Sequence, residues 1–246
     1  MMLLGSCNFS YTGFKYENCP EILLQSMHLN RVKNIKTGFL FRILIFCMSA
    51  NGSVNGQTID FIEIDSVRWA QKNLAVIRFR NGDSLLLANS VEAWIEAGTK
   101  KQAAYCYYDE NPDNVDKYGI LYNWYAVTDP RGLAPEGWRM PSLNEWQKLI
   151  TSVGGDDLAV KKIKSKTGWS KKRNGNNQTG LDAQPAGYKS SCGHFFDSAT
   201  NTAIWWTSTA DGNNTAKAIR IDSDSPLVKI TGSNKGSGFS VRCIKE

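Results

Sequence analysis

The end of the chain constrains the fold most, because four strand-like segments follow one another there with only short polar turns between them. The segments are AIWWTST, AKAIRI, LVKI and GFSVRCIK, and the turns are DGNN, DSDSP and GSNKGSG. Apolar and β-branched runs bounded by Gly, Asn, Asp and Pro are typical of strands joined by turns. Helical patterns precede these strands, and helices followed by consecutive strands indicate an α+β architecture.

Two helices are predicted in the middle of the chain. The first, VEAWIEA, begins at Asn89, which stands three residues before Glu92, and ends at Gly98. The second covers Tyr118–Val127, YGILYNWYAV, whose side chains are too large to be exposed on every side. We therefore expect short helices that are largely covered by other elements.

The clearest helix start in the sequence follows Pro141. The Ser142 hydroxyl can accept from the amide of Glu145, and the Glu145 carboxylate can accept from the amide of Ser142, which is a capping box. Trp146, Leu149 and Ile150 then lie on one face of the helix. Because the cap explains these residues without a ligand, we assign Ser142, Glu145 and Trp146 structural roles.

The first fifty residues have the pattern of a secretory leader. Within Met27–Ala50 a basic stretch is followed by an apolar run from Ile43 and then by small residues. That run is far shorter than the roughly 20 residues of a membrane-spanning helix, so we expect no transmembrane segment. We interpret residues 27–56 as a signal peptide region, residues 1–26 as an over-called N-terminal extension, and residues 57–246 as one domain. The cleavage site and lipidation of Cys47 stay open.

The formal charge of +6 comes largely from this leader. Residues 1–50 hold five of the 29 basic and two of the 23 acidic residues, which leaves +3 for the remainder. We therefore expect no nucleic-acid partner. A basic stretch from Lys161 to Arg173 is interpreted as a solvated helix face followed by a loop.

Few residues after the leader can support catalysis or metal binding. His194 is the one histidine there, which argues against a multi-histidine metal site. Cys192 and His194 could act as nucleophile and base, but their spacing has no specificity. The run from Asp109 lacks the glycine and the glutamate of an EF-hand loop. We therefore predict no cofactor, no metal and no catalytic residues.

Three cysteines remain after the leader, namely Cys106, Cys192 and Cys243. Three cysteines allow at most one internal disulfide, with three choices of pair. A domain of this size does not need a disulfide to fold, so the sequence leaves the pairing open.

Aromatic residues offer the most interesting candidates for binding. All eight tryptophans follow the leader, and exposed rings give rigid contact surfaces with a polar edge. The alternative is that they fill the interior of a loop-rich fold. Consecutive residues on a strand face opposite ways, so only one of Trp205 and Trp206 need be buried. The predicted ligand-binding residues are Tyr188, Trp205, Trp206, Asp211, Asn213 and Asn214.

An ordered series of motifs gives the chain a family resemblance. The motifs are AAYCYYDENPDNVDKYGILYNWYAV, GLAPEGWRMPSLNEWQKL, GWSKKRNGNNQTGLDAQPAGY, IWWTST and GFSVRCIKE. Together they resemble the Fibrobacter succinogenes major paralogous domain family of exported proteins. GWRMPSLNEW is also similar to a helix start in formylglycine-generating enzymes, and this similarity implies a C-type-lectin-like fold with short helices, small antiparallel sheets and long loops.

The resemblance also bears on individual residues. It implies structural roles for Trp138 and Cys243, which lie in the motifs. Family members often carry cysteines near Cys106 and Pro135 that this sequence lacks, so Cys106 and Cys243 either pair with each other or stay thiols. The catalytic cysteine pair of the formylglycine-generating enzymes has no match here.

These observations predict an exported, non-catalytic recognition or adhesion module that binds a glycan or an envelope or host protein. It would lie at the cell surface, in the periplasm or outside the cell. A structural envelope component without a small-ligand site is the alternative, and a hydrolase or oxidase using Cys192 and His194 is a further one. The sequence does not indicate the oligomeric state.

Overall fold

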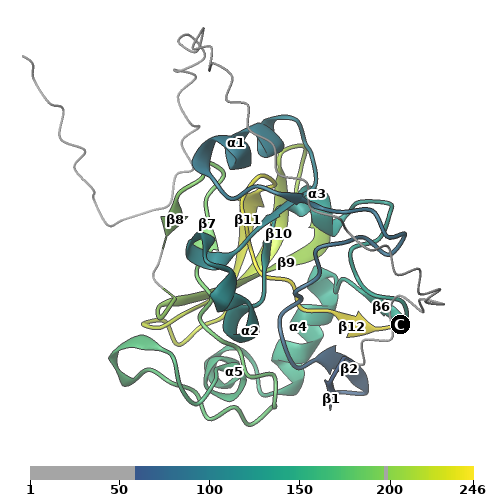
Figure 1. Cartoon of the computed structure of the whole chain (residues 1–246). Helices are drawn as coiled ribbons and strands as arrows, with labels where there is room; N and C mark the ends of the chain where they lie inside the picture. Colours follow the sequence, from purple (N-terminus) through teal and green to yellow (C-terminus); the bar gives the residue numbers. More distant parts are fainter. Residues whose placement is uncertain (1–58, 197–198) are drawn as a thin grey trace, which may run out of the picture. The chain divides into compact units, whose positions relative to one another are not determined.

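The computed structural model describes residues 59–196 and 199–246, and the signal peptide region predicted at 27–56 lies outside them. The described residues belong to one compact unit of short helices and small sheets (Figure 1). The strands are β1 (Phe61–Ile64), β2 (Val67–Ala70), β3 (Leu86–Leu87), β4 (Ala104–Cys106), β5 (Leu121–Tyr122), β6 (Trp138–Arg139), β7 (Tyr188–Lys189), β8 (Phe195–Phe196), β9 (Thr202–Ala210), β10 (Thr215–Asp222), β11 (Lys229–Asn234) and β12 (Ile244–Lys245). The helices are α1 (Val91–Thr99), α2 (Val115–Tyr118), α3 (Trp124–Val127), α4 (Leu143–Ser152) and α5 (Asp156–Ile163), with 3-10 turns η1 (Tyr108–Glu110), η2 (Pro112–Asn114) and η3 (Ser170–Lys172).

The strands form four small sheets, with the orders β1-β2-β12-β6, β11-β10-β9, β3-β4-β5 and β7-β8. Among the described strands, every pair is antiparallel except β3 with β4. The predicted α+β class is therefore confirmed. In the first sheet β12 lies between β2 and β6, so the beginning and the end of the described chain meet there (Figure 1).

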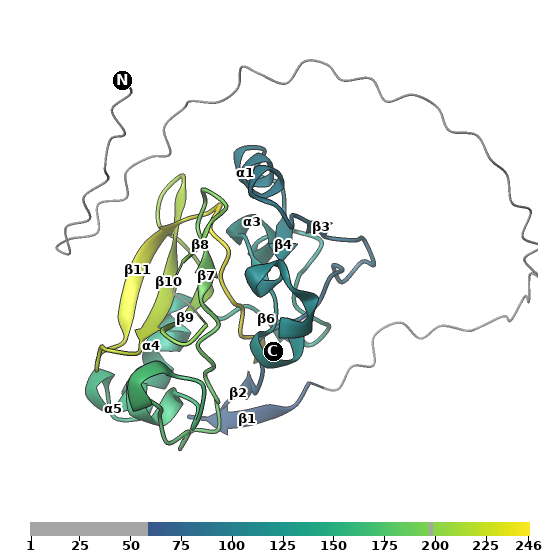
Figure 2. The same cartoon turned by 60° about the vertical axis from the view of Figure 1, so that its left-hand side comes forward.

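The second sheet forms the centre of the packing. Figure 2 shows β9, β10 and β11 side by side, with α4 and α5 below them. Trp205 on β9 packs with Trp69 and Trp146 in one core cluster. Trp206, the next residue, lies in another cluster with Phe239 and donates through Nε1 to the Tyr122 carbonyl at 2.8 Å. Both faces of β9 are thus covered.

This arrangement corrects one expectation about the aromatic residues. Trp205 and Trp206 are 0% and 1% exposed, so both are buried, whereas the alternation along the strand required only one of them to be. All the other tryptophans are buried as well except Trp124, which is half-buried. The rings therefore fill the interior between small sheets, as the packing alternative required.

The helix starting at Ser142 is confirmed in detail. The Ser142 hydroxyl accepts from the amide of Glu145, and the Glu145 carboxylate accepts from the amide of Ser142 at 2.8 Å. Trp146, Leu149 and Ile150 are all buried on the inner face of α4. The structural role predicted for this segment follows from those contacts.

The other two helices differ from the prediction. The N-cap of α1 is Ser90, whose hydroxyl accepts from Ala93, and the helix continues through Gly98 to Thr99. The single helix predicted over Tyr118–Val127 is wrong. α2 ends at Tyr118, β5 follows, and α3 starts only at Trp124. The apolar run arises because this segment supplies buried residues to three successive elements, α2, β5 and α3.

The basic stretch after Val160 is only partly solvated. Lys161 and Lys166 are exposed, as predicted for a solvated face. Lys164 is instead 3% exposed, and its ammonium donates to the Asp222 carbonyl at 2.7 Å. Burial lowers the pKa of Lys164 to about 8. The interpretation as a solvated face is therefore wrong at this residue.

The remaining structural predictions concern Trp138 and the cysteines. Trp138 and Cys243 both lie in the largest core cluster. Cys106 and Cys243 are free and buried, so they do not pair with each other. Burial raises the pKa of each thiol to about 12, which keeps both protonated and unreactive.

Candidate functional site

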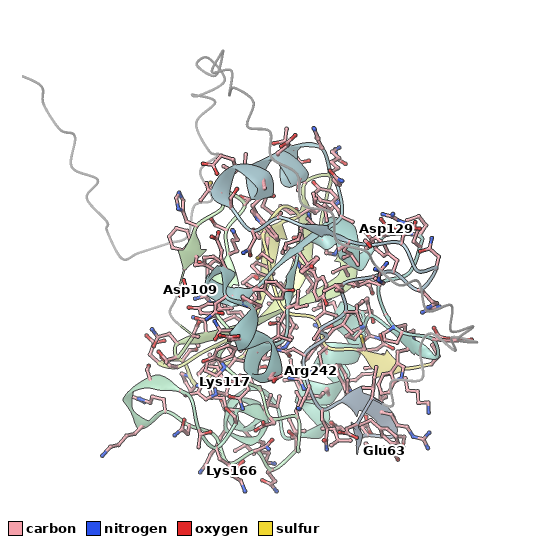
Figure 3. All side chains as sticks on the ribbon, in the orientation of Figure 1. Glu63, Asp109, Lys117, Asp129, Lys166 and Arg242 are labelled. Atoms are coloured by element: carbon pink, nitrogen blue, oxygen red, sulfur yellow. The ribbon has the colours of Figure 1, made fainter. Side chains whose placement is uncertain are left out.

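A cavity of about 380 Å³ opens beside α2 and is the candidate functional site. This volume is within the range of small-ligand sites. Figure 3 labels Lys117 on α2 and Arg242 next to it. Five separate segments of the chain supply the lining residues, which are Gln71, Lys72, Asn73, Ala75, Val115, Asp116, Lys117, Gly119, Thr167, Asp182, Gln184 and Arg242.

Arg242 is the most unusual residue of this lining. It is 1% exposed and has no ion pair with any described residue. Burial lowers its pKa to about 10, although the charge of Asp182 opposes that shift. The side chain is therefore a buried cation without a carboxylate in contact, which is rare because a buried charge normally requires a partner.

The hydrogen bonds of Arg242 are all on one side of its guanidinium. Nη1 donates to the carbonyls of Ala70 at 3.1 Å and Leu181 at 2.9 Å, and also to that of Gln71. Nε is buried without a partner, and Nη2 has no hydrogen bond to a described residue. The edge formed by Nε and Nη2 is thus unused by the described residues.

One wall of the cavity is fixed to the core through Asn73. Its Oδ1 accepts from Trp205 Nε1 at 2.9 Å, and its Nδ2 donates to the Tyr118 carbonyl at 2.9 Å and the Ser240 hydroxyl at 3.3 Å. This amide therefore links β9, α2 and the segment before Arg242. A wall held in this way is formed before any ligand arrives.

Gly119 brings α2 close to that wall. Its φ is +74°, and a Cβ at this position would lie 2.7 Å from Asn73 Cβ and 3.0 Å from the Leu74 carbonyl oxygen. Only glycine combines this backbone conformation with such a close approach. This close approach explains why a glycine stands within the apolar run Tyr118–Val127.

Another part of the lining is built around Asp182. Its carboxylate accepts from Asn177 Nδ2 at 3.2 Å and Gln184 Nε2 at 3.0 Å, and its own amide donates to Asn177 Oδ1 at 2.8 Å. These bonds hold the carboxylate against neutral amides, and no ion pair forms with Arg242. The charge of Asp182 thus acts on the guanidinium without an ion pair between the two groups.

The cavity therefore offers amides, a threonine hydroxyl, carboxylates and ammonium groups, and none of its lining residues is aromatic. Such groups form hydrogen bonds to polar ligands. Among residues 59–196 and 199–246, no group of three or more His, Cys, Asp or Glu is placed to hold a metal ion. Nor does that part of the chain contain a helix long and apolar enough to cross a membrane.

None of the six residues predicted to bind a ligand lines this cavity. Trp205 and Trp206 are buried, as described above, and therefore have no face for a ligand. Tyr188 is half-buried and stacks on Phe196, with the ring centroids 6.0 Å apart. Phe196 is exposed, so the Tyr188–Phe196 pair lies partly at the surface.

The DGNN turn has a structural explanation. Asp211 forms an ion pair with Lys217 at 2.8 Å. The carbonyls of Asn213 and Asn214 accept from the side chain and the backbone amide of Lys235, both at 2.9 Å. These contacts hold the turn between β9 and β10 against Lys235, the first residue after β11. They account for the polar sequence without a ligand.

Cys192 and His194 lie in the turn between β7 and β8. Cys192 is half-buried and disulfide-bonded, and His194 is exposed. The amide of His194 donates to the Ser190 hydroxyl at 3.3 Å, which stabilises the turn.

Sequence reasoning missed Arg242, Asn73 and Gly119. The one available signal was the arginine inside GFSVRCIK, where a charged residue stands between Val241 and Cys243 in an otherwise apolar segment. A charge in such a position is either paired or functional.

Comparisons with known proteins give one match. A family model described as the Fibrobacter succinogenes major domain matches residues 62–245. No curated protein and no solved structure matches the chain. The match extends from β1 to β12, so it includes every residue that lines the cavity.

Proposed function

The chain belongs to the Fibrobacter succinogenes major domain family, and on this basis we propose that it is an exported, non-catalytic recognition module that binds a glycan in the cavity beside α2. The observation that carries the proposal is the cavity itself, in which side chains from five segments direct polar groups toward one space. The lining is more polar than that of most ligand sites, which favours a polar ligand.

The chemistry of the walls favours a saccharide over an apolar ligand. Gln71, Gln184 and Thr167 provide amide and hydroxyl groups, which both donate and accept and therefore match sugar hydroxyls. Since no aromatic ring lines the cavity, selection would depend on hydrogen bonds and charge rather than on stacking. The rigid Asn73 wall keeps the entropic cost of binding low.

We further propose a C-type-lectin-like fold for the domain. The similarity of GWRMPSLNEW to the helix start of formylglycine-generating enzymes supports it. The sheet in which β12 lies between β2 and β6 also supports it, because it brings the two ends of the domain together.

Export is part of the proposal because of the leader pattern in residues 27–56. An exported module would meet its ligand at the cell surface, in the periplasm or outside the cell. Glycans of an envelope or a host are abundant in those places. The proposal includes no nucleic-acid partner.

A glycan array with the purified protein, followed by calorimetric titration of the hits, tests this function. Gln71→Ala and Thr167→Ala change exposed side chains of the lining and should each weaken binding. Gln147→Ala and Lys148→Ala change exposed positions on α4 and serve as matched controls. The proposal is contradicted if the lining variants bind the glycan with unchanged affinity, or if the array gives no hit.

A structural component of the envelope is the second candidate. The burial of every tryptophan but Trp124 favours it, because the rings that could form a contact surface are used for packing. This candidate predicts that the protein stays bound to isolated envelopes when the cavity is altered by Gln71→Ala and Thr167→Ala. Release of those variants from the envelope would exclude it.

A further inference from the structure

The free edge of Arg242 indicates which class of glycan the cavity takes. We propose that the cavity selects an acidic saccharide whose carboxylate binds the Nε and Nη2 edge of Arg242. This inference rests on the proposed function and goes beyond it, since glycan binding by itself does not require a charged ligand.

The geometry of the guanidinium supports this. Nη1 is saturated by the carbonyls of Ala70, Gln71 and Leu181, which fix the plane of the group. Nε and Nη2 point along one edge and are the two donors that pair with a carboxylate in a bidentate contact. Nε is a buried donor without a partner, so the described protein leaves it unsatisfied.

The accessibility of the two donors differs. Nε is fully buried, whereas Nη2, which has no hydrogen bond to a described residue, is not fully buried and belongs to a side chain that lines the cavity. A ligand oxygen would therefore reach Nη2 first. Since the three carbonyls hold the guanidinium in place, the atoms that cover Nε must move before the carboxylate completes the pair there.

The charges around the cavity agree with an anionic ligand. Lys72 and Lys117 are exposed residues of the lining, and their ammonium groups can approach a ligand. The lining also contains two acidic residues, the exposed Asp116 and Asp182, whose carboxylate accepts from Asn177 and Gln184, so basic residues outnumber acidic ones by three to two. The field of a buried, unpaired guanidinium is only weakly screened, so it attracts an anion into the cavity.

Three matched ligands test the inference by calorimetry with the full chain. They are a uronic-acid trisaccharide, its methyl ester, and the neutral trisaccharide of the same linkage. The acid should bind at least about tenfold more tightly than the ester, since a bidentate charged contact is lost on esterification. The preference should fall as salt rises.

Variants separate the role of Arg242 from a general charge effect. Arg242→Lys keeps a cation but loses the planar fork, so the ratio of acid to ester affinity should fall by about tenfold. Because this buried substitution can impair folding, Lys72→Gln and Lys117→Gln provide a second measurement at exposed positions. Each should lower the affinity for the acid about two- to threefold, as expected for a screened surface charge. Lys148→Gln on α4 is the control and should have no effect.

The outcomes are distinguishable. If the ester and the neutral sugar bind as tightly as the acid, the inference is overturned and glycan binding stands. If none of the three binds and the array has no hit, the proposed function fails as well. If acetate or an acidic peptide competes as strongly as the uronic-acid trisaccharide, the site recognises a carboxylate alone and the saccharide part of the inference is overturned.

Discussion

Two regions of the molecule bury charge in opposite ways. At the end of β10, Asp222 is 6% exposed and accepts from Arg220 at 2.7 Å, Thr202 at 2.9 Å and Lys229 at 2.8 Å. Beside α2, Arg242 is buried just as deeply but contacts only carbonyl oxygens. A charge whose partners are complete is explained by the fold. A buried cation without a carboxylate in contact is the charge that a bound anion would stabilise most.

The pKa values express the same contrast. Burial alone would raise the pKa of Asp222, but the bonds from Lys229, Arg220 and Thr202 lower it below its ordinary value. Burial lowers the pKa of Arg242 to about 10, and the charge of Asp182 opposes this shift only in part. The Asp222 cluster therefore stabilises its charge, whereas the cavity carries a cost that an anionic ligand would relieve.

Breaking the Asp222 cluster should have the largest effect. Asp222→Asn keeps the volume but removes the buried carboxylate that accepts from Arg220, Lys229 and Thr202, so the free energy of unfolding should fall by about 3–5 kcal/mol. Denaturant unfolding measures this. Lys229→Gln alters a half-exposed partner of the same carboxylate and should cost about 1 kcal/mol or less. Equal losses in the two variants would show that the cluster is not a buried network.

Breaking the cavity wall should have the next largest effect. Gly119→Ala places a Cβ 2.7 Å from Asn73 Cβ at a φ of +74°, which should cost about 1–3 kcal/mol and also abolish ligand binding. Gly82→Ala is the matched control, because φ there is +94° but no atom lies within 4 Å. It should share the backbone strain and leave binding intact. If Gly119→Ala binds normally, the cavity is not the site.

A paired arginine at the surface sharpens the comparison. Arg139 donates to Glu145 at 2.5 and 2.9 Å, and this bond together with those from Ser142 lowers the pKa of Glu145 to about 2. Glu145→Gln keeps an amide oxygen for the cap but removes the charge that pairs with Arg139, so it should cost about 1 kcal/mol or less. In the unaltered protein this contribution is present above the ordinary pKa near 4.5 and is lost as the pH falls toward 2. Unfolding midpoints between pH 2 and 6 should therefore converge for the two proteins at the acid end.

The smallest effect concerns Lys164, which adjoins the Asp222 cluster. With its pKa lowered from 10.5 to about 8, the unfolded chain binds a proton between these values that the folded chain lacks, so stability rises with pH in that window. Lys164→Met should remove this rise, and the exposed Lys161→Met should keep it. Thermal midpoints at pH 8, 9 and 10 give the slope. An unchanged slope in Lys164→Met would assign the rise to other groups.

Local features of the fold were predictable from the sequence. The cap of α4 was found because Ser142 and Glu145 are three residues apart, so neighbouring residues decide it. The single helix predicted over Tyr118–Val127 failed because its interruption at Gly119 depends on Asn73, far away in the chain. Periodicity records that a segment is buried but not which element covers it.

The sequence by itself determined the α+β class, the family and the cap of α4, because these depend on composition, ordered motifs and residues that are close along the chain. The tertiary structure alone decided that Trp205 and Trp206 are both buried, since both faces of β9 are covered. It also decided the candidate site. The carbonyls that hold Arg242 belong to Leu181 and Ala70, 61 and 172 residues away, and no pattern along the chain encodes a meeting over that distance.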